Sequence, residues 1–296
     1  MTTKIKNIVL APLNILYKLS PALTLKILFA IKNGYRLNLK NPKTYNEKLQ
    51  WVKVNFKHPL LTKLVDKYTV REYVMAKAPE LLTKVYWSGF DAKEIPWDDL
   101  PNKFVIKVTH GSGFNIICKD KNKINKNECI FKLNNWLKEK FLRCYGEWFY
   151  GVEEPRILIE EFLDAGDGKV PEDYKIFCFD GEPRFIAVDT DRFTNHKRNI
   201  YDLEWNFMKG VTLNFPNDNP LQVPEKLEEL ITYAKLLSQG FPHVRVDLYI
   251  VKDKVYFGEM TFTNGAGFDK IKPKEFDEKL GELFKLGEYH DASFNH

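Results

Sequence analysis

A predicted strand that runs into a glycine-rich loop constrains this chain most strongly. Side chains of residues 104–109 alternate with the two-residue period of a β-strand, which puts Lys107 opposite the most apolar positions. The loop Gly111-Ser112-Gly113 follows, and a second apolar run spans residues 114–118. Glycines let backbone N–H groups turn toward an anion, and a nearby lysine adds positive charge. The stretch suits a phosphate, although ordinary hairpin loops also favour glycine, and a Walker loop would place the lysine after the glycines.

A second hairpin is predicted from residue 243 to residue 262, with a three-residue turn at 252–254. The cross-strand pairs expected from this turn are Val251–Val255, Tyr249–Phe257, Asp247–Glu259 and Arg245–Thr261. Opposed like charges destabilise a sheet unless a cation lies between them. Because Mg²⁺ binds carboxylates together with nucleotide phosphates, Asp247 and Glu259 are candidate metal ligands. The alternatives are two solvated carboxylates or a turn of another length.

Length and composition are typical of a folded globular protein. The chain has 296 residues with 44% hydrophobic and 14% aromatic content, which supports a substantial core. A net charge of +5 from 45 basic and 40 acidic residues is too evenly mixed to suggest nucleic acid as a partner. The four cysteines lack metal-site spacing, so we expect buried reduced thiols and a cytoplasmic location.

The N-terminal stretch at residues 5–31 is apolar but carries lysines at positions 6, 18 and 26. Pro12 and Pro21 interrupt it, so we expect two short amphipathic helices and neither a signal peptide nor a membrane span. These helices either pack on the body, which we favour, or lie peripherally on the inner face of an anionic membrane.

Local signals fix several further elements. Thr44 and Glu47 have the spacing of a capping box at the start of a helix, and His58-Pro59 ends that helix. An apolar stripe from Leu61 to Tyr68 predicts another helix, with Lys67 at its polar edge. Asp180-Gly181 predicts a hairpin turn.

Taken in order, these motifs resemble the ATP-grasp superfamily and, within it, the TupA-like group found among bacterial cell-surface polysaccharide genes. The passages that carry the resemblance are NPKTYNEKLQW (41–51), DKYTVREYV (66–74), FVIKVTHGSG (104–113), DYKIFCFDGEPRFI (173–186) and VRVDLY with YFGEMTF (244–249 and 256–262). It covers nearly the whole chain. It implies an α+β fold in which two lobes with mainly antiparallel sheets hold ATP between them. The implied segments are an N-terminal helical segment (1–60), an N-terminal lobe with the glycine loop (61–160) and a C-terminal lobe with the metal site (161–296).

The resemblance also implies a nucleotide site. The residues expected there are Lys67, Lys107, Gly111, Ser112, Gly113, Glu160, Glu161, Phe162, Leu163, Asp173, Lys175 and Lys197. Glu160 would accept from the adenine amino group, the backbone of Phe162 and Leu163 would contact the ring edge, and Asp173 would bind the ribose. Two alternatives stay open: Lys67 as a solvated helix lysine, and Lys175 as an ion-pair partner of Asp173.

For metal and catalysis, the resemblance implies Mg²⁺ on Asp247 and Glu259. Thr261 stands where many ATP-grasp enzymes have asparagine, so Asn264 is an alternative ligand. Arg245 is expected to stabilise an oxyanion, Arg192 to contact a substrate carboxylate, and Lys107 to hold phosphate.

The implied reaction is ATP-dependent ligation of a carboxylate to an amine through an acyl phosphate, joining an amino acid or peptide to a uronic-acid-containing surface glycan. An ATP-dependent glycan phosphotransferase is the first alternative. The others are a glycosyltransferase using the D-x-D triplet at 189–191 and a scaffold that binds nucleotide without turnover.

Overall fold

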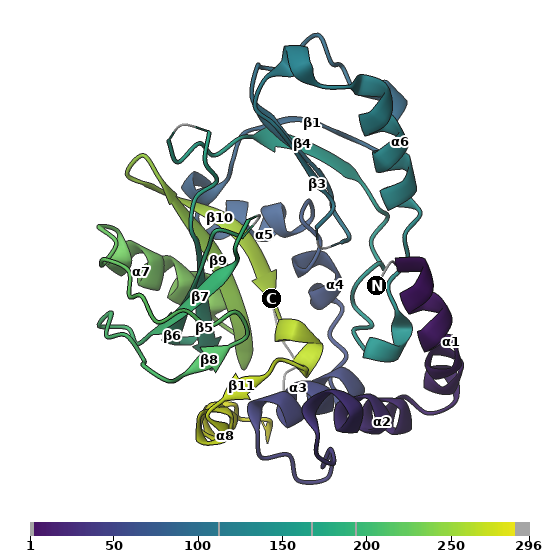
Figure 1. The fold of residues 1–296 in the computed structure, drawn as a ribbon, viewed down its shortest axis with the longest axis vertical. Coiled ribbons are helices and arrows are strands. Elements are labelled where there is room, and N and C mark those ends of the chain that lie inside the picture. Colours follow the sequence, from purple (N-terminus) through teal and green to yellow (C-terminus); the bar gives the residue numbers. More distant parts are fainter. Residues whose placement is uncertain (1–2, 112, 167, 193, 288–296) are drawn as a thin grey trace.

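Two antiparallel sheets form the frame of the molecule in the computed structural model, which describes residues 3–111, 113–166, 168–192 and 194–287 (Figure 1). Helices pack around the sheets, and the N-terminal helices α1 and α2 lie along one side. The predicted α+β architecture with an N-terminal helical segment is therefore confirmed. The division into segments 1–60, 61–160 and 161–296 stays a prediction.

The four-stranded sheet contains the predicted glycine-loop hairpin. In spatial order its strands are β1 (Val85–Gly89), β4 (Ile157–Glu161), β2 (Phe104–Val108) and β3 (Asn115–Cys118). Phe104, Ile106 and Ile159 are buried in a core that α6 (Lys126–Leu137) covers from one face. Lys107 projects from the other face, as the alternation predicts.

The five-stranded sheet carries the downstream hairpin. Its strands, in spatial order, are β10 (Lys254–Thr261), β9 (His243–Val251), β5 (Asp173–Phe179), β6 (Glu182–Thr190) and β7 (Lys197–Tyr201). Helix α7 (Leu227–Ser238) packs against β5, β6 and β9. A small sheet pairs β8 (Thr212–Leu213) with β11 (Ile271–Lys272). The sheet face that carries Arg245 and Asp247 is left for polar chemistry, because Val244, Val246 and Leu248 take the alternate positions in the core.

Six further helices belong to the described part of the chain. They are α1 (Thr3–Leu19), α2 (Pro21–Asn33), α3 (Tyr45–Asn55), α4 (Leu60–Leu64), α5 (Val70–Lys77) and α8 (Lys274–Leu283). Short 3-10 turns are η1 (Pro79–Leu81), η2 (Ala92–Glu94), η3 (Lys121–Lys123), η4 (Arg143–Tyr145) and η5 (Asn264–Gly267). Tyr45 and Phe284 pack on Phe179 and His243, which ties α3 and the segment after α8 to the sheet.

Local predictions are confirmed at some helix ends and wrong at another. The capping box is present, since the Glu47 N–H donates to Thr44 Oγ1 (3.2 Å) and the Thr44 N–H donates to Glu47 Oε2 (3.2 Å). The single helix expected from Leu61 to Tyr68 is wrong, because α4 ends at Leu64. The Asp66 carboxylate accepts the backbone N–H groups of Tyr68 and Thr69 (2.9 and 3.0 Å), which competes with helical hydrogen bonding there.

The N-terminal helices pack on the body through one face. Leu25, Leu28 and Phe29 are buried in a cluster that also contains Cys144 and Phe268. None of the helices in the described ranges is long and apolar enough to cross a bilayer. All four cysteines are buried, as predicted.

Candidate active site

The β9–β10 hairpin brings Asp247 and Glu259 face to face, although not by the predicted route. Its turn has two residues, Lys252 and Asp253, both with the positive φ of a type I′ turn. The register therefore begins with Val251 opposite Lys254, and the predicted pairs Val251–Val255 and Tyr249–Phe257 are wrong by one residue.

A β-bulge at Gly258 then shifts the register back. Beyond it, Asp247 opposes Glu259 and Arg245 opposes Thr261, so these two predicted pairs are confirmed. A Cβ on Gly258 would lie 2.9 Å from the Asp247 carbonyl oxygen, closer than a real Cβ comes. Only glycine fits this close approach, and the bulge sets the direction of the following side chains.

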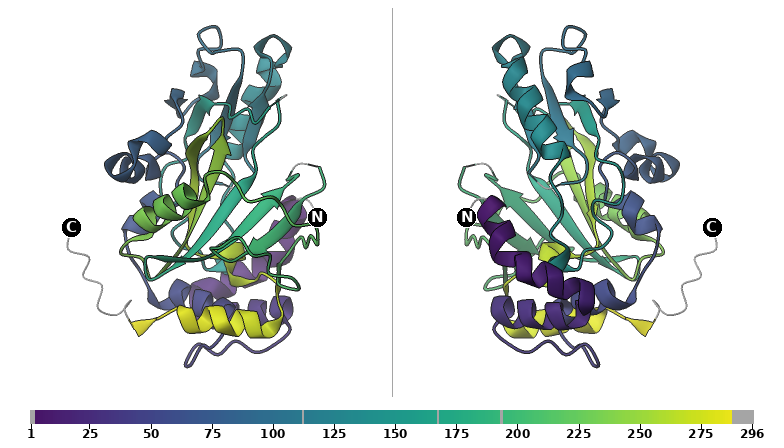
Figure 2. Two further views of the ribbon diagram at one scale, coloured as in Figure 1. Left: turned by 90° about the vertical axis from the view of Figure 1, so that its left-hand side faces the viewer. Right: turned by 90° about the vertical axis from the view of Figure 1, so that its right-hand side faces the viewer.

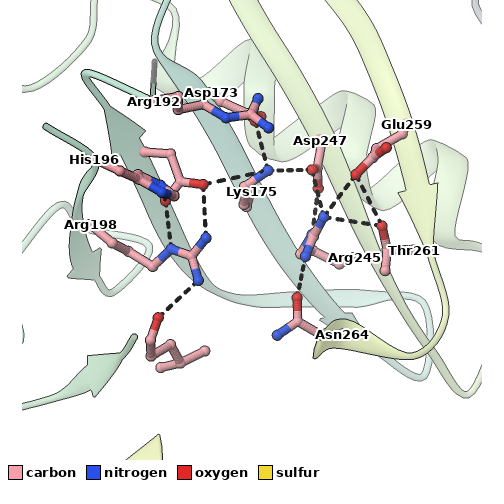
Figure 3. A network of polar contacts seen from close by, with 12 residues as sticks. Asp173, Lys175, Arg192, His196, Arg198, Arg245, Asp247, Glu259, Thr261 and Asn264 are labelled. Carbon is pink, nitrogen blue, oxygen red and sulfur yellow. Dashed lines mark hydrogen bonds and ion pairs between the residues drawn. The ribbon is translucent and has the colours of Figure 1, made fainter. Parts of the chain in front are cut away.

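Arg245 supplies the cation between the two carboxylates (Figure 3). Its Nε donates to Asp247 Oδ1 (2.6 Å), and its Nη2 donates to Asp247 Oδ2 (2.7 Å) and Glu259 Oε1 (3.0 Å). Nη2 also reaches Thr261 Oγ1 (3.1 Å), and Nη1 donates to Asn264 Oδ1. The predicted metal ligands Asp247, Glu259 and Thr261 thus all accept hydrogen bonds from the Arg245 guanidinium.

Lys175 holds Asp247 from the neighbouring strand β5. Its Nζ lies 2.5 Å from Asp247 Oδ2 and 2.7 Å from Asp173 Oδ2, and all three side chains are buried. Arg192, 38% exposed, also donates to Asp173. The alternative interpretation of Lys175, as an ion-pair partner of Asp173, matches this geometry. Asp173 Oδ1 is buried and has no hydrogen-bond partner in the described part of the chain.

Burial and neighbouring charges set the protonation of these groups. Burial raises the pKa of Asp247 to about 6, against the lowering effect of Arg245 and Lys175. Burial also opposes ionisation of Glu259, but Lys67 and Arg245 outweigh it and hold the pKa of Glu259 at about 2. The two carboxylates are therefore chemically distinct: the pKa of Glu259 lies far below neutral pH, whereas the pKa of Asp247 lies much closer to it.

Charged side chains continue across the sheet onto β6 and the edge strand β7. Asp189 opposes Asp173 across β5 and β6, and Arg198 donates to both Asp189 oxygens (2.5 and 2.8 Å). Burial opposes ionisation of Asp189, but Arg198 and Lys175 hold its pKa below the usual range. Lys197 pairs with Thr190 in the backbone register. No hydrogen bond or ion pair of the described residues joins Lys197 to the cluster, so the structure does not bring it to the site.

The glycine-loop side contributes two lysines. Lys107 forms an ion pair with Glu160, which also accepts from Thr83 Oγ1 (2.8 Å). Lys67, from the turn after α4, donates from Nζ to the Gly111 carbonyl oxygen (2.6 Å). Burial lowers the pKa of Lys67, while the charge of Glu259 raises it. Lys67 therefore contacts the glycine loop and interacts electrostatically with Glu259. Ser112 lies outside the described residues.

A cavity of about 210 Å³ lies between the two sheets. Its walls include Lys107, Gly113, Glu160, Glu161, Phe162 and Leu163 from one side and Arg192, Tyr249 and Phe257 from the other. A second cavity of about 680 Å³ shares Ile117, Val170, Pro171 and Arg192 with it. Phe162 is buried and Leu163 half-buried directly after β4, where the chain passes from one sheet to the other. The residues expected at the adenine, Glu160, Phe162 and Leu163, thus line the same cavity as Lys107.

The donor set fits a magnesium ion bound together with phosphates. No group of three or more His, Cys, Asp or Glu side chains converges on a common point within the described ranges. Mg²⁺ commonly takes only one or two protein carboxylates and completes its shell with phosphate and water oxygens. Asp247 and Glu259 can supply that pair, and the Asn264 side-chain oxygen lies beside them on Arg245. Thr261 Oγ1 lies within 3.4 Å of Glu259 Oε1.

Sequence reasoning offered Arg198 only as an alternative to Lys197 for a phosphate contact, and it missed the ion pair of Arg198 with Asp189 and the anchoring of the loop after β10. Lys53 and Gln50 of α3 both donate to the Ala266 carbonyl oxygen (2.8 and 3.1 Å) in η5. Lys53 is fully buried, and burial lowers its pKa to about 7. Its helical position alone does not signal this role, whereas Arg198 could have been found from its opposition to Asp189 in a strand pair.

Comparisons with known proteins give one family match. The family model described as TupA-like ATPgrasp matches residues 47–285. A comparison with curated proteins gave no significant match.

Solved structures give more distant similarities. D-alanine–D-alanine ligase from Bacillus anthracis, complexed with ATP, is 15% identical with a TM-score of 0.41, over 69% of this chain and 57% of that one. ATP-grasp ligase PsnB, complexed with a minimal precursor, Mg and ADP, is 9% identical with a TM-score of 0.40, over 82% and 66%. D-alanine–D-alanine ligase from Helicobacter pylori is 15% identical with a TM-score of 0.41, over 75% and 61%. The chain spans less than two thirds of each of these proteins.

Proposed function

Because the chain belongs to the TupA-like ATP-grasp family, we propose that it is an ATP- and Mg²⁺-dependent ligase that joins a carboxylate to an amine through an acyl phosphate. One observation carries this proposal: at the junction of the two sheets, Lys67 donates to the Gly111 carbonyl oxygen of the glycine loop and its charge reaches Glu259 of the β9–β10 hairpin. Lys67 influences the pKa of Glu259 across that junction.

The nucleotide would lie in the 210 Å³ cavity with its adenine at the end of β4. Glu160, Phe162 and Leu163 offer acceptor and backbone groups there, and Lys107 lies on the same wall. Lys107 already pairs with Glu160, so its amine is held in place before phosphate oxygens arrive. Asp173, with one unpaired buried oxygen, is the candidate contact for the ribose.

Asp247 and Glu259 would hold Mg²⁺, which neutralises charge on phosphate oxygens during phosphoryl transfer when it is bound. The chain's own residues supply the remaining electrostatics. Arg245 presents a guanidinium fixed by Asp247, Thr261 and Asn264, and its charge would stabilise the oxyanion formed when the amine attacks. Arg192 is partly exposed at the cavity wall and would orient the substrate carboxylate.

For the substrates, we propose a uronic-acid-containing cell-surface polysaccharide or its precursor as one partner and an amino acid or peptide as the other. We place the reaction in the cytoplasm, where ATP is available, and the four buried cysteines suit a reducing compartment.

Hydroxylamine trapping tests the reaction class. The purified protein is incubated with ATP, Mg²⁺, a uronic-acid oligosaccharide and hydroxylamine as a small substitute amine. A ligase gives ADP, free phosphate and a hydroxamate of the sugar acid, all dependent on the carboxylate substrate. Phosphate retained on the sugar would indicate the phosphotransferase instead. ATP left intact with every carboxylate tried, while ATP binds, would contradict a ligase and favour a nucleotide-binding scaffold.

A further inference from the structure

The N-terminal end of the chain has an unusual charge distribution. Its first 46 residues contain eight basic residues and no Asp or Glu, although the whole chain has a net charge of only +5. The eight are Lys4, Lys6, Lys18, Lys26, Lys32, Arg36, Lys40 and Lys43. The rest of the protein is therefore slightly acidic, and the positive charge is concentrated on and around α1 and α2.

Helix α2 is apolar on two faces. Leu25, Leu28 and Phe29 are buried against the body. Leu23, Ile27 and Ile31 recur every four residues on the opposite, exposed face. An ordinary surface helix is polar on its outer side, so packing on the body accounts for only one face of α2.

Helix α1 repeats the pattern. Ile15 and Leu19, four residues apart, are 64% and 80% exposed. Lys18 and Lys26 are exposed and directly precede Leu19 and Ile27 in the sequence. The right-hand view of Figure 2 shows α1 and α2 as an outer layer along one side of the molecule. We call Ile15, Leu19, Leu23, Ile27 and Ile31 with Lys18 and Lys26 the basic apolar surface.

We propose that the basic apolar surface docks the protein peripherally on an anionic membrane. Exposed aliphatic side chains can enter the boundary between headgroups and acyl chains, while the lysines meet anionic headgroups. Charge selects this occupant over a second copy of the chain, because two segments this basic repel each other. Each lysine close to an anionic bilayer surface raises the affinity of the protein for that bilayer about fivefold.

Docking in this way would bring two cavities that α1 and α2 help to line close to the membrane. Tyr17 of α1 lines a cavity of about 660 Å³, and Lys32 of α2 lines another of about 440 Å³. Gly111 of the glycine loop belongs to the wall of the second cavity. A use of these cavities for a membrane-linked acceptor rests on the proposed ligase function, whereas the membrane contact itself does not.

Vesicle flotation with the full chain tests the contact. We expect binding to vesicles of phosphatidylcholine mixed with phosphatidylglycerol, weaker binding to phosphatidylcholine alone, and loss of binding as salt is raised. The triple variant Leu23→Ser, Ile27→Ser, Ile31→Ser should bind at least about tenfold more weakly. The variant Lys18→Gln, Lys26→Gln should lose roughly 30-fold on the anionic vesicles and little on neutral ones.

The matched control is Met75→Ser, Phe131→Ser, Val223→Ser, which removes three apolar side chains of similar exposure (57–69%) elsewhere on the surface. It should float as the parent does, and circular dichroism should show all variants folded. Absence of the parent from anionic vesicles would overturn the proposal, as would equal binding of the Leu23, Ile27 and Ile31 variant. A concentration-dependent dimer would also overturn the proposal, if the Leu23, Ile27 and Ile31 variant abolished the dimer and left vesicle binding unchanged. These outcomes do not depend on ligase activity.

Discussion

Lys175 and Asp247 form a 2.5 Å ion pair between neighbouring strands of the five-stranded sheet. Arg245, two residues earlier on the same strand, donates two hydrogen bonds to the same carboxylate. Asp247 is therefore held from two sides. A carboxylate fixed in this way loses little conformational freedom when a ligand arrives. The pair therefore both satisfies a buried charge and orients a candidate metal ligand.

Replacing Asp247 with asparagine should abolish ligase turnover, with ADP formation falling by about 10²–10³ or more. The amide keeps the shape but removes the charge proposed to bind Mg²⁺. Because Lys175 and Arg245 lose part of their compensation, the free energy of unfolding should also fall, by about 2 kcal/mol. Enzyme assays and urea unfolding measure the two effects. Asp98→Asn, at a carboxylate that is 96% exposed, is the matched control and should change neither. Full turnover of Asp247→Asn would eliminate this metal site.

Lys107→Ala should weaken ATP binding about 10- to 100-fold, because a charge-assisted contact to phosphate is lost. Isothermal titration with ATP and Mg²⁺ measures the change. Lys123→Ala, at a lysine that is 84% exposed, serves as control and should bind as the parent does. Lys67→Ala should also weaken ATP binding, since both amines lie on the glycine-loop side of the site. If Lys107→Ala binds ATP normally, the nucleotide does not lie along this wall of the cavity.

Much of the site was predictable because its local signals are strong. Alternation placed Lys107 on the polar face of β2, and the capping box of Thr44 and Glu47 was readable from residue spacing alone. The pairing of Asp247 with Glu259 was reached although the turn was one residue shorter than expected. The bulge at Gly258 compensated for that error, so the correct pairing followed from an incomplete model of the hairpin.

What could not be predicted depends on register and strand order. An irregularity between Phe177 and Cys178 shifts the β5–β6 pair so that Asp173 meets Asp189. Counting back from Asp180-Gly181 without that irregularity would place Asp173 one residue away. The partner of Asp247 on β5 depends on the insertion of β5 between β6 and β9, which no local pattern encodes. Ion pairs such as Lys175–Asp247 appear only once that order is known.

The bulge itself is testable through Gly258→Ala. The new Cβ would meet the Asp247 carbonyl oxygen and a Tyr249 ring carbon at 2.9 Å each, so the strands must separate. We expect a loss of about 1–3 kcal/mol in the free energy of unfolding and a larger loss in turnover than stability explains, because Glu259 follows the bulge directly. Gly287→Ala, which meets no atom within 4 Å, is the control. Wild-type activity in Gly258→Ala would mean that the bulge does not position Glu259.

The buried side chain of His243 gives a prediction about how stability depends on pH. His243 Nδ1 lies 2.8 Å from the Cys178 carbonyl oxygen, which can only accept, so Nδ1 carries the proton. Nε2 then accepts from the Tyr45 hydroxyl at 2.8 Å. The ring is neutral and fully bonded, and burial, helped by the charge of Arg245, lowers the pKa of His243 to about 3. Below its ordinary pKa of 6.5 the unfolded chain therefore binds a proton that the folded chain refuses.

Acidification should consequently reduce the contribution of His243 to stability, by up to about 1.4 kcal/mol per pH unit below pH 6.5 until the folded pKa is reached. The parent curve alone would hide this slope. Burial raises the pKa of Asp247 and of Asp277 to about 6, so each protonates first in the folded state and stabilises it as pH falls through that value. The difference between the parent and His243→Gln isolates the histidine. Urea unfolding followed by tryptophan fluorescence should show this difference shrinking by about 2–3 kcal/mol between about pH 6 and about pH 4. A difference that stays constant over this range would mean that the buried ring accepts a proton as readily as it does in the unfolded chain.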